Sequence, residues 1–166
     1  MWSQFYTRVG LAILGLVAGT GTCIPATSTP ATFSVQMTIT ASCTITSTST
    51  LNFGSQTLLT SAVDQTATLQ VQCTSGTPYN IAMDAGTASG STVTTRKMTS
   101  GSNTVNYSLF RDAGRTQNWG STVSSDTVSG TGNGSAQSHT IYGRVPAQTS
   151  PAPGSYTDTI TVTVEY

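Results

Sequence analysis

Apolar and polar residues alternate without interruption from Phe33 to Thr46, with Phe, Val, Met, Ile, Ala, Cys and Ile at the odd positions. Alternation with period two is typical of a β-strand that buries one face. At about 3.3 Å per residue this stretch would span roughly 45 Å, whereas strands of small domains usually span roughly 17 to 20 Å. The pattern therefore predicts two strands in series, of which one remains in its own fold and the other is available to a second molecule.

The rest of the chain contains short alternating stretches separated by turn residues, and no helical periodicity follows the N-terminal segment. Glycine and proline between these stretches indicate turns. The pattern predicts an all-β protein, most simply a β-sandwich, with a long surface loop at Ser121–Ser135. The predicted strands are Leu69–Cys73, Tyr79–Met83, Val105–Leu109, Thr140–Val145 and Tyr156–Tyr166.

An uncharged stretch, Val9–Ala18, follows Arg8 near the N-terminus. It is too short to span a bilayer but suits the apolar core of a secretory signal peptide. Small residues come next, and we expect cleavage after Ala31, with cleavage after Ala26 as the alternative. Residues 1–31 are therefore predicted to be a signal peptide, and the protein to be exported.

Three cysteines are present, and removal of the signal peptide takes Cys23 away and leaves Cys43 and Cys73. An even pair in an oxidising compartment indicates one disulfide bond, which would close a loop of about 30 residues. A lipid-modified Cys23 is the alternative, although the residues before it lack the leucine of a lipoprotein signal. The chain has no CxxC motif and a single histidine, so we expect no metal site and no cofactor.

Charged residues are few and balanced, since six Lys or Arg and six Asp or Glu give a formal net charge of zero. Nucleic-acid binding requires a basic patch, which these scattered residues do not form. We interpret Arg111, Asp112 and Arg115 as an ion-pair cluster that braces the fold rather than as a ligand site. Trp119 is interpreted as a core residue, with an exposed, sugar-contacting role as the alternative.

His139 follows Ser138, and an aspartate could complete a Ser–His–Asp triad with them. However, the chain has no GxSxG motif, and one histidine in a serine-rich chain always has a serine nearby. We therefore predict that the protein is not an enzyme. The aspartates considered for such a triad are Asp112, Asp126 and Asp158.

Cys43 and Cys73 each fall on the apolar face of a predicted strand, so a bond between them would tie the two strands together. Phe33–Thr40 would then be an N-terminal arm with no segment immediately before it to form a hairpin. An exposed alternating arm is an aggregation hazard unless a groove receives it. Strand addition to a sheet that lacks one strand supplies such a groove.

Several motifs along the chain resemble the spore coat protein U family, which includes the Csu-type subunits of archaic chaperone/usher pili. The spacing of these motifs together, rather than any one of them, makes the resemblance specific. They are Thr40-Ala-Ser-Cys-Thr-Ile45, Leu51-Asn-Phe-Gly54, Tyr107-Ser-Leu-Phe-Arg-Asp-Ala-Gly-Arg-Thr116, Ile141-Tyr-Gly143 and Gly154-Ser-Tyr-Thr-Asp-Thr-Ile-Thr-Val-Thr-Val-Glu-Tyr166.

The resemblance implies a periplasmic pilin with an incomplete immunoglobulin-like β-sandwich, completed first by a chaperone strand and then by the N-terminal arm of the next subunit. The donor strand of the family maps onto four residues of this arm. Residues 32–41 are accordingly expected to form the donor-strand extension, and residues 42–166 the pilin domain. The four donor residues are Phe33, Val35, Met37 and Ile39.

The resemblance also implies partners and a location. The partners are identical or related pilin subunits in a head-to-tail polymer, a periplasmic chaperone and an outer-membrane usher. The protein would pass through the periplasm to the cell surface, with no membrane span after signal cleavage. It is thus predicted to be a structural subunit of an archaic chaperone/usher pilus that polymerises by donor-strand exchange, for surface adhesion and biofilm formation.

Two alternatives make different demands on the chain. A tip adhesin would need a second, receptor-binding domain and should have no arm to donate. A secreted monomeric β-sandwich, acting as a binding protein or as a spore-coat or matrix protein, would pair its long first strand within its own fold.

Overall fold

The structure is a computed structural model, and it describes residues 25–166. Most of the predicted signal peptide, including Cys23, lies outside these residues. The chain divides into two units, Met1–Met37 and Thr38–Tyr166. Residues 25–37, the described part of the first unit, form no strand and are exposed.

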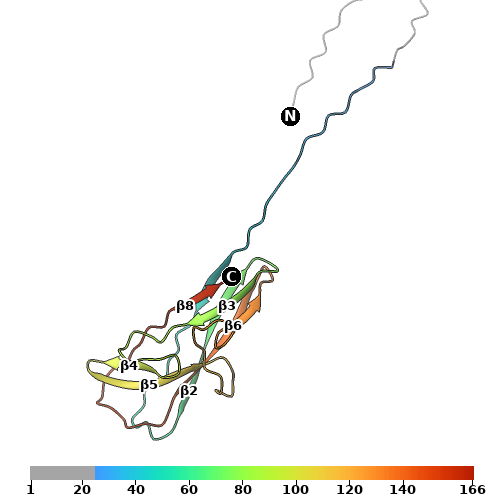
Figure 1. The fold of residues 1–166 in the computed structure, drawn as a ribbon. Helices are drawn as coiled ribbons and strands as arrows, with labels where there is room; N and C mark the ends of the chain where they lie inside the picture. Colours follow the sequence, from blue (N-terminus) through green and yellow to red (C-terminus); the bar gives the residue numbers. More distant parts are fainter. Residues whose placement is uncertain (1–24) are drawn as a thin grey trace, which may run out of the picture. The chain divides into compact units, whose positions relative to one another are not determined.

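The second unit is an all-β sandwich of two antiparallel sheets, which confirms the predicted fold class (Figure 1). Five strands form one sheet in the order β1-β2-β7-β5-β4, and three form the other in the order β6-β3-β8. The strands are β1 (Cys43–Thr48), β2 (Val63–Cys73), β3 (Pro78–Met83), β4 (Arg96–Ser100), β5 (Asn103–Phe110), β6 (Val128–Thr131), β7 (Ala136–Val145) and β8 (Val162–Glu165).

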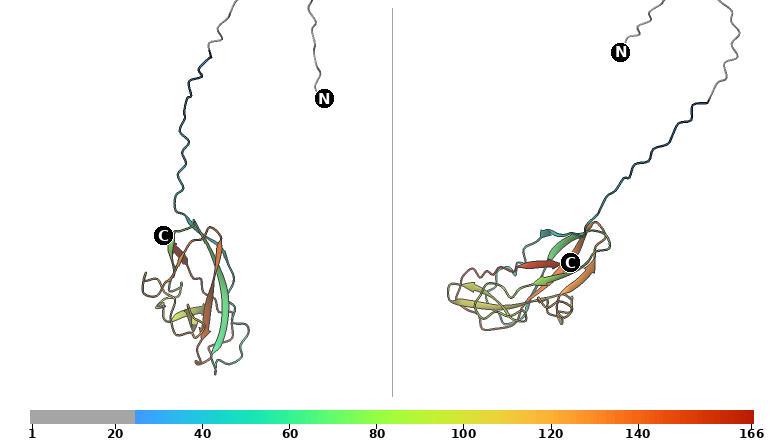
Figure 2. Two further views of the ribbon diagram at one scale, coloured as in Figure 1. Left: turned by 90° about the vertical axis from the view of Figure 1, so that its right-hand side faces the viewer. Right: turned by 45° about the horizontal axis from the view of Figure 1, so that its top comes forward.

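The longest ladder joins β2 to β7 from the pair Val63 and Val145 to the pair Gln72 and Ala136. Figure 2 shows these two strands side by side. Every second residue of β2 from Ala67 onward is buried, and its neighbours are mostly exposed, as alternation predicts for a sheet with one solvated face. β2 and β7 are thus the most extensively paired strands of the larger sheet.

The core lies between the two sheets. Trp119 is only 1% exposed and donates a hydrogen bond of 2.8 Å from Nε1 to the carbonyl of Ile81. The interpretation of Trp119 as a core residue is therefore confirmed. The buried strand residues around it include Leu69, Val71, Tyr79, Ile81, Met83, Val105, Tyr107, Leu109 and Ile141.

The strands predicted at 69–73, 79–83, 105–109 and 140–145 are present within β2, β3, β5 and β7. Three details of the prediction are wrong. The loop predicted at 121–135 contains β6, the pattern did not reveal β4, and the last strand begins at Val162 rather than Tyr156. Before Val162 only an isolated bridge between Thr99 and Thr157 is formed.

Candidate functional site

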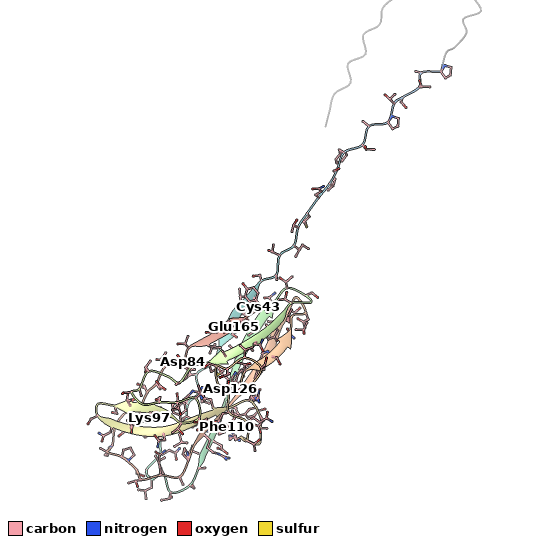
Figure 3. All side chains as sticks on the ribbon, viewed as in Figure 1. Cys43, Asp84, Lys97, Phe110, Asp126 and Glu165 are labelled. Carbon is pink, nitrogen blue, oxygen red and sulfur yellow. A yellow bond between two sulfur atoms is a disulfide. The ribbon has the colours of Figure 1, made fainter. Side chains whose placement is uncertain are left out.

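Two strand edges lie free and near each other on one side of the sandwich. β1 pairs only with β2, and β8 pairs only with β3, so each has an edge without a hydrogen-bonded neighbour among the described strands. Cα atoms of β1 and β8 nevertheless approach within 8 Å. Figure 3 labels Cys43 on β1 and Glu165 on β8 at the same end of the domain.

The β8 edge carries apolar side chains that the fold covers only in part. Ile160, Val162 and Val164 share one face of the chain, as the sequence predicts, and each is half-buried against the core. The last residue on this face, Tyr166, is 63% exposed. An added strand could therefore gain both backbone hydrogen bonds and apolar contacts at this edge.

A strand inserted between β1 and β8 needs space that the two edges do not leave everywhere. Hydrogen-bonded strands lie about 4.8 Å apart, so strands that flank an inserted one are separated by roughly 10 Å. The nearest Cα atoms of β1 and β8 are within 8 Å of each other, which is less than the roughly 10 Å that an inserted strand requires. Full insertion of a strand between them would therefore widen the space between β1 and β8.

The four predicted donor residues belong to the segment before β1. Phe33, Val35, Met37 and Ile39 are between 76% and 86% exposed, and their segment forms no strand. Isolated apolar residues are common on protein surfaces, but four large ones at alternate positions of one unpaired segment are not. The long alternating run is thus divided at Cys43, where the regular strand begins.

The predicted disulfide bond between Cys43 and Cys73 is confirmed, and it lies at the root of this segment. The two residues face each other in the β1–β2 register with Cα atoms 4.1 Å apart. The next residue, Thr74, holds the chain just before β1. Its N–H donates to the Ser42 carbonyl at 2.9 Å, and its Oγ1 accepts from the Ser42 N–H at 3.2 Å and lies 3.4 Å from the Thr40 carbonyl.

The role of Thr74 was not foreseen from the sequence. A threonine after the last residue of a strand has no distinctive pattern, because serine and threonine are abundant throughout the chain. Only the register of Cys43 opposite Cys73 places Thr74 beside Ser42. The pairing of the cysteines was therefore predictable, but the hydrogen bonds next to it were not.

The side chains that could suggest catalysis have other partners. His139 Nε2 lies 3.0 Å from the Tyr79 hydroxyl, and burial lowers the pKa of the imidazole. The candidate aspartates are bound elsewhere: Asp112 accepts from Thr116 and Gln117, Asp126 from Thr122, and Asp158 from Thr87 and Tyr107. No Ser–His–Asp triad is assembled in the described part of the chain.

The interpretation of Arg111, Asp112 and Arg115 as one ion-pair cluster is wrong. Arg115 pairs with Asp64 at 3.3 Å, and Arg144 pairs with the same carboxylate at 2.7 Å. Arg111 instead donates to the Thr127 carbonyl at 2.8 Å. The prediction failed because the Asp112 carboxylate accepts hydrogen bonds from backbone N–H groups of its own turn. These hydrogen bonds, above all the one from Gln117, also lower the pKa of Asp112.

Two open, polar hollows of about 370 and 200 Å³ share Arg111 and Val128 in their linings. The smaller one includes Ser138 and His139, between which no hydrogen bond is formed among the described residues. Within residues 25–166 no three His, Cys, Asp or Glu side chains gather as a metal site requires. Nor does this part of the chain contain a helix with the length and hydropathy to cross a membrane.

A sequence profile of the spore coat protein U domain matches residues 29–163. The chain belongs to the spore coat protein U domain family. The match covers most of the chain and includes the segment before β1. This family assignment indicates a structural protein rather than an enzyme. No curated protein matches the chain.

The same fold occurs in a solved structure from Acinetobacter baumannii, the CsuC–CsuE chaperone–tip adhesion subunit pre-assembly complex of archaic chaperone-usher Csu pili. The TM-score is 0.57 and the sequence identity 24%, over 78% of this chain and 40% of that chain. This spore coat protein U domain chain therefore spans less than half of the protein that it matches, and the likeness establishes the shared fold.

Proposed function

We propose that the protein is a structural subunit of an archaic chaperone/usher pilus and polymerises by donor-strand exchange. The observation that carries the proposal is the coexistence of two complementary features in one chain. Residues 33–39 offer four exposed apolar side chains at alternate positions, and β8 offers a free edge with half-buried apolar side chains. The apolar segment of one copy could therefore add to the free β8 edge of a second copy.

The exchange would be energetically substantial. Burial of a large apolar side chain contributes roughly 1.5 to 3 kcal/mol, so four donor residues would contribute on the order of 6 to 12 kcal/mol before ordering costs. Hydrogen bonds along the β8 edge would add to this. Because a donor segment and an acceptor edge are different surfaces, the contact is head-to-tail and propagates as a filament.

The proposal assigns residues 1–31 to a signal peptide, residues 32–41 to the donor extension and residues 42–166 to the pilin domain. It also includes a periplasmic chaperone, which would cover the acceptor edge before assembly, and an outer-membrane usher. The solved complex with the shared fold joins a chaperone to a subunit of Csu pili, which supports this partner. Adhesion to surfaces and biofilm formation would follow from the filament at the cell surface.

Deletion of residues 32–41 tests the donor assignment. The shortened subunit should be exported, keep its acceptor edge and fail to polymerise. Attachment of the same segment after Tyr166 through a short linker should give a soluble, self-complemented monomer, because the C-terminus follows directly from β8. Filaments from the deletion variant would show that another segment is the donor.

Electrophoresis in SDS separates the pilus subunit from the alternative of a secreted monomeric sandwich or coat protein. Strand-exchanged material should run as a ladder of multimers without boiling and as a monomer after boiling. A single monomer band in both lanes would favour the solitary sandwich. Loss of surface attachment and biofilm by cells that export the deletion variant would test the adhesive role separately.

A further inference from the structure

The root of the N-terminal arm coincides with the disulfide bond. Cys43 is the first residue of β1, and Cys73 is the last residue of β2. In the second unit, the first residue with a hydrogen bond is Thr40, through the Thr74 hydroxyl. The predicted donor residue Ile39 therefore lies only four positions before a covalent link to the larger sheet.

The strand that bears the arm is held weakly by its own contacts. β1 has six residues, pairs only with β2, and its register shifts between Ile45 and Ser47. All of its residues after Cys43 are exposed, so little apolar burial resists its removal. An edge strand of this kind depends mainly on a few solvent-exposed hydrogen bonds, and such elements have low local stability.

The strand on the other side of the disulfide bond is held firmly. β2 lies between β1 and β7 and pairs with β7 over ten residues. Its inward side chains Leu69, Val71 and Cys73 are at most 1% exposed. Removal of β2 would therefore open the core, whereas removal of β1 would not.

We propose that the Cys43–Cys73 disulfide carries tension from the N-terminal arm directly into β2 and so prevents β1 from being pulled out when a filament is stretched. The inference rests on the proposed polymer, in which the arm of each subunit is its connection to a neighbour. Tension on the arm reaches Cys43 before any other residue of β1. Because the covalent bond is at the first residue of β1, the tension passes into β2 before it loads the hydrogen bonds of β1. A disulfide at the Thr48 end would leave those hydrogen bonds to carry the tension.

Force–extension measurements on single filaments, before and after reduction with dithiothreitol, test the proposal. Oxidised filaments should keep β1 in place. After reduction, β1 should leave the sheet and the filament should lengthen, by a distance per subunit on the order of the 20 Å that its six residues span at about 3.3 Å per residue. Identical curves before and after reduction, with free thiols confirmed by titration, would overturn the proposal.

Variants separate the disulfide from other effects. Filaments of the double variant Cys43→Ala/Cys73→Ala should lengthen like reduced wild-type filaments and should not respond to dithiothreitol. If this variant does not fold, reduction of assembled wild-type filaments still decides the question; if the wild-type bond resists reduction, the variant decides it. Absence of filaments from the wild-type protein would instead contradict the proposed function itself.

Thr74→Val distinguishes the disulfide from the neighbouring hydrogen bonds. This near-isosteric change removes the hydroxyl that holds Ser42 and Thr40. Oxidised Thr74→Val filaments should show the wild-type extension, as should the matched control Thr66→Val on the exposed face of β2. If oxidised Thr74→Val filaments instead extend as far as reduced wild-type filaments, the Thr74 hydroxyl and not the disulfide holds β1 in place, and the proposal is overturned.

Discussion

The hydroxyl of Tyr107 donates a hydrogen bond of 2.7 Å to the Asp158 carboxylate. The other oxygen of this carboxylate accepts from the backbone N–H of Thr87 at 2.9 Å and from the Thr87 hydroxyl at 2.8 Å. Burial alone would raise the pKa of Asp158, but these hydrogen bonds outweigh it, so the pKa lies below the usual 3.8. The carboxylate thus joins β5 to the loop after β3 and to the chain that precedes β8.

This lowered pKa predicts how stability depends on pH. The unfolded chain binds a proton at Asp158 with a pKa near 3.8, whereas the folded chain does so only at lower pH. The stabilisation is therefore complete above pH 3.8 and is lost as the pH falls through the folded pKa. Acid should weaken the domain in part through this residue.

Asp158→Asn should lower the free energy of unfolding at pH 7 by about 1 to 3 kcal/mol, because a charged acceptor of several hydrogen bonds is lost. The difference from wild type should shrink as the pH falls below about 4. Thermal unfolding of the exported protein from pH 7 to pH 2 measures this. Glu165→Gln removes one exposed carboxylate and is the control; a difference between Asp158→Asn and wild type that is constant with pH would contradict the linkage.

The sequence predicted the features that depend on local pattern. Alternation identified β2, β3, β5 and β7, and the parity of Cys43 and Cys73 agrees with their pairing. It did not reveal β6, because Val128–Thr131 contains one large apolar residue and is a strand through its pairing with β3. The free edges of β1 and β8 follow from strand order, which no local pattern encodes.

Arg96 shows a second limit of sequence reasoning, because a single arginine among threonines gave no sign of burial. Its side chain is fully buried and donates to the carbonyls of Asp84, Val93, Met83 and Trp119 at 2.7 to 3.3 Å. Burial lowers the pKa of the guanidinium, and nearby acidic groups oppose this change. The planar group with five donors thus links the end of β3 to the chain before β4 and to the chain after β5.

Arg96→Lys should therefore destabilise the domain by about 3 kcal/mol, since an ammonium group cannot reach all four carbonyls and leaves buried acceptors unpaired. Lys97→Met, at the more exposed neighbouring position of the same strand, should change stability by less than about 0.5 kcal/mol. Chemical denaturation of both variants beside wild type measures the difference. Equal stability of the two variants would show that the four hydrogen bonds contribute little.

Gly143 explains why two of the sequence motifs occur together. A Cβ atom at this position would lie 2.5 Å from Leu51 Cδ2 and 3.0 Å from Phe53 Cζ. The Leu51-Asn-Phe-Gly54 segment thus packs directly on β7 at Gly143, and the Phe53 ring meets Tyr107 edge-on at 6.2 Å. The two motifs are therefore linked by close packing, because a side chain at position 143 would collide with Leu51 and Phe53.

Gly143→Ala should destabilise the domain by about 1 to 3 kcal/mol, because Leu51 must move from its packed position. Leu51→Ala alone should also destabilise, through the cavity that it leaves. In the double variant the new methyl group occupies part of that cavity. The double variant should therefore lose less stability than the sum of the losses in the two single variants. Thermal unfolding of the four proteins completes the cycle, and strictly additive losses would rule out a direct contact.

The alternation of the donor segment gives the sharpest test of assembly, because adjacent positions should respond in opposite ways. Val35→Asp places a charge on the face that would enter the acceptor edge, where burial of an unpaired carboxylate is strongly unfavourable. Gln36→Asp introduces the same charge on the other face, which would remain in water. Both positions are exposed in the single chain, so neither change should affect folding or the disulfide bond. Electron microscopy of exported material should show filaments for Gln36→Asp and none for Val35→Asp, and filaments from both variants would exclude an apolar acceptor.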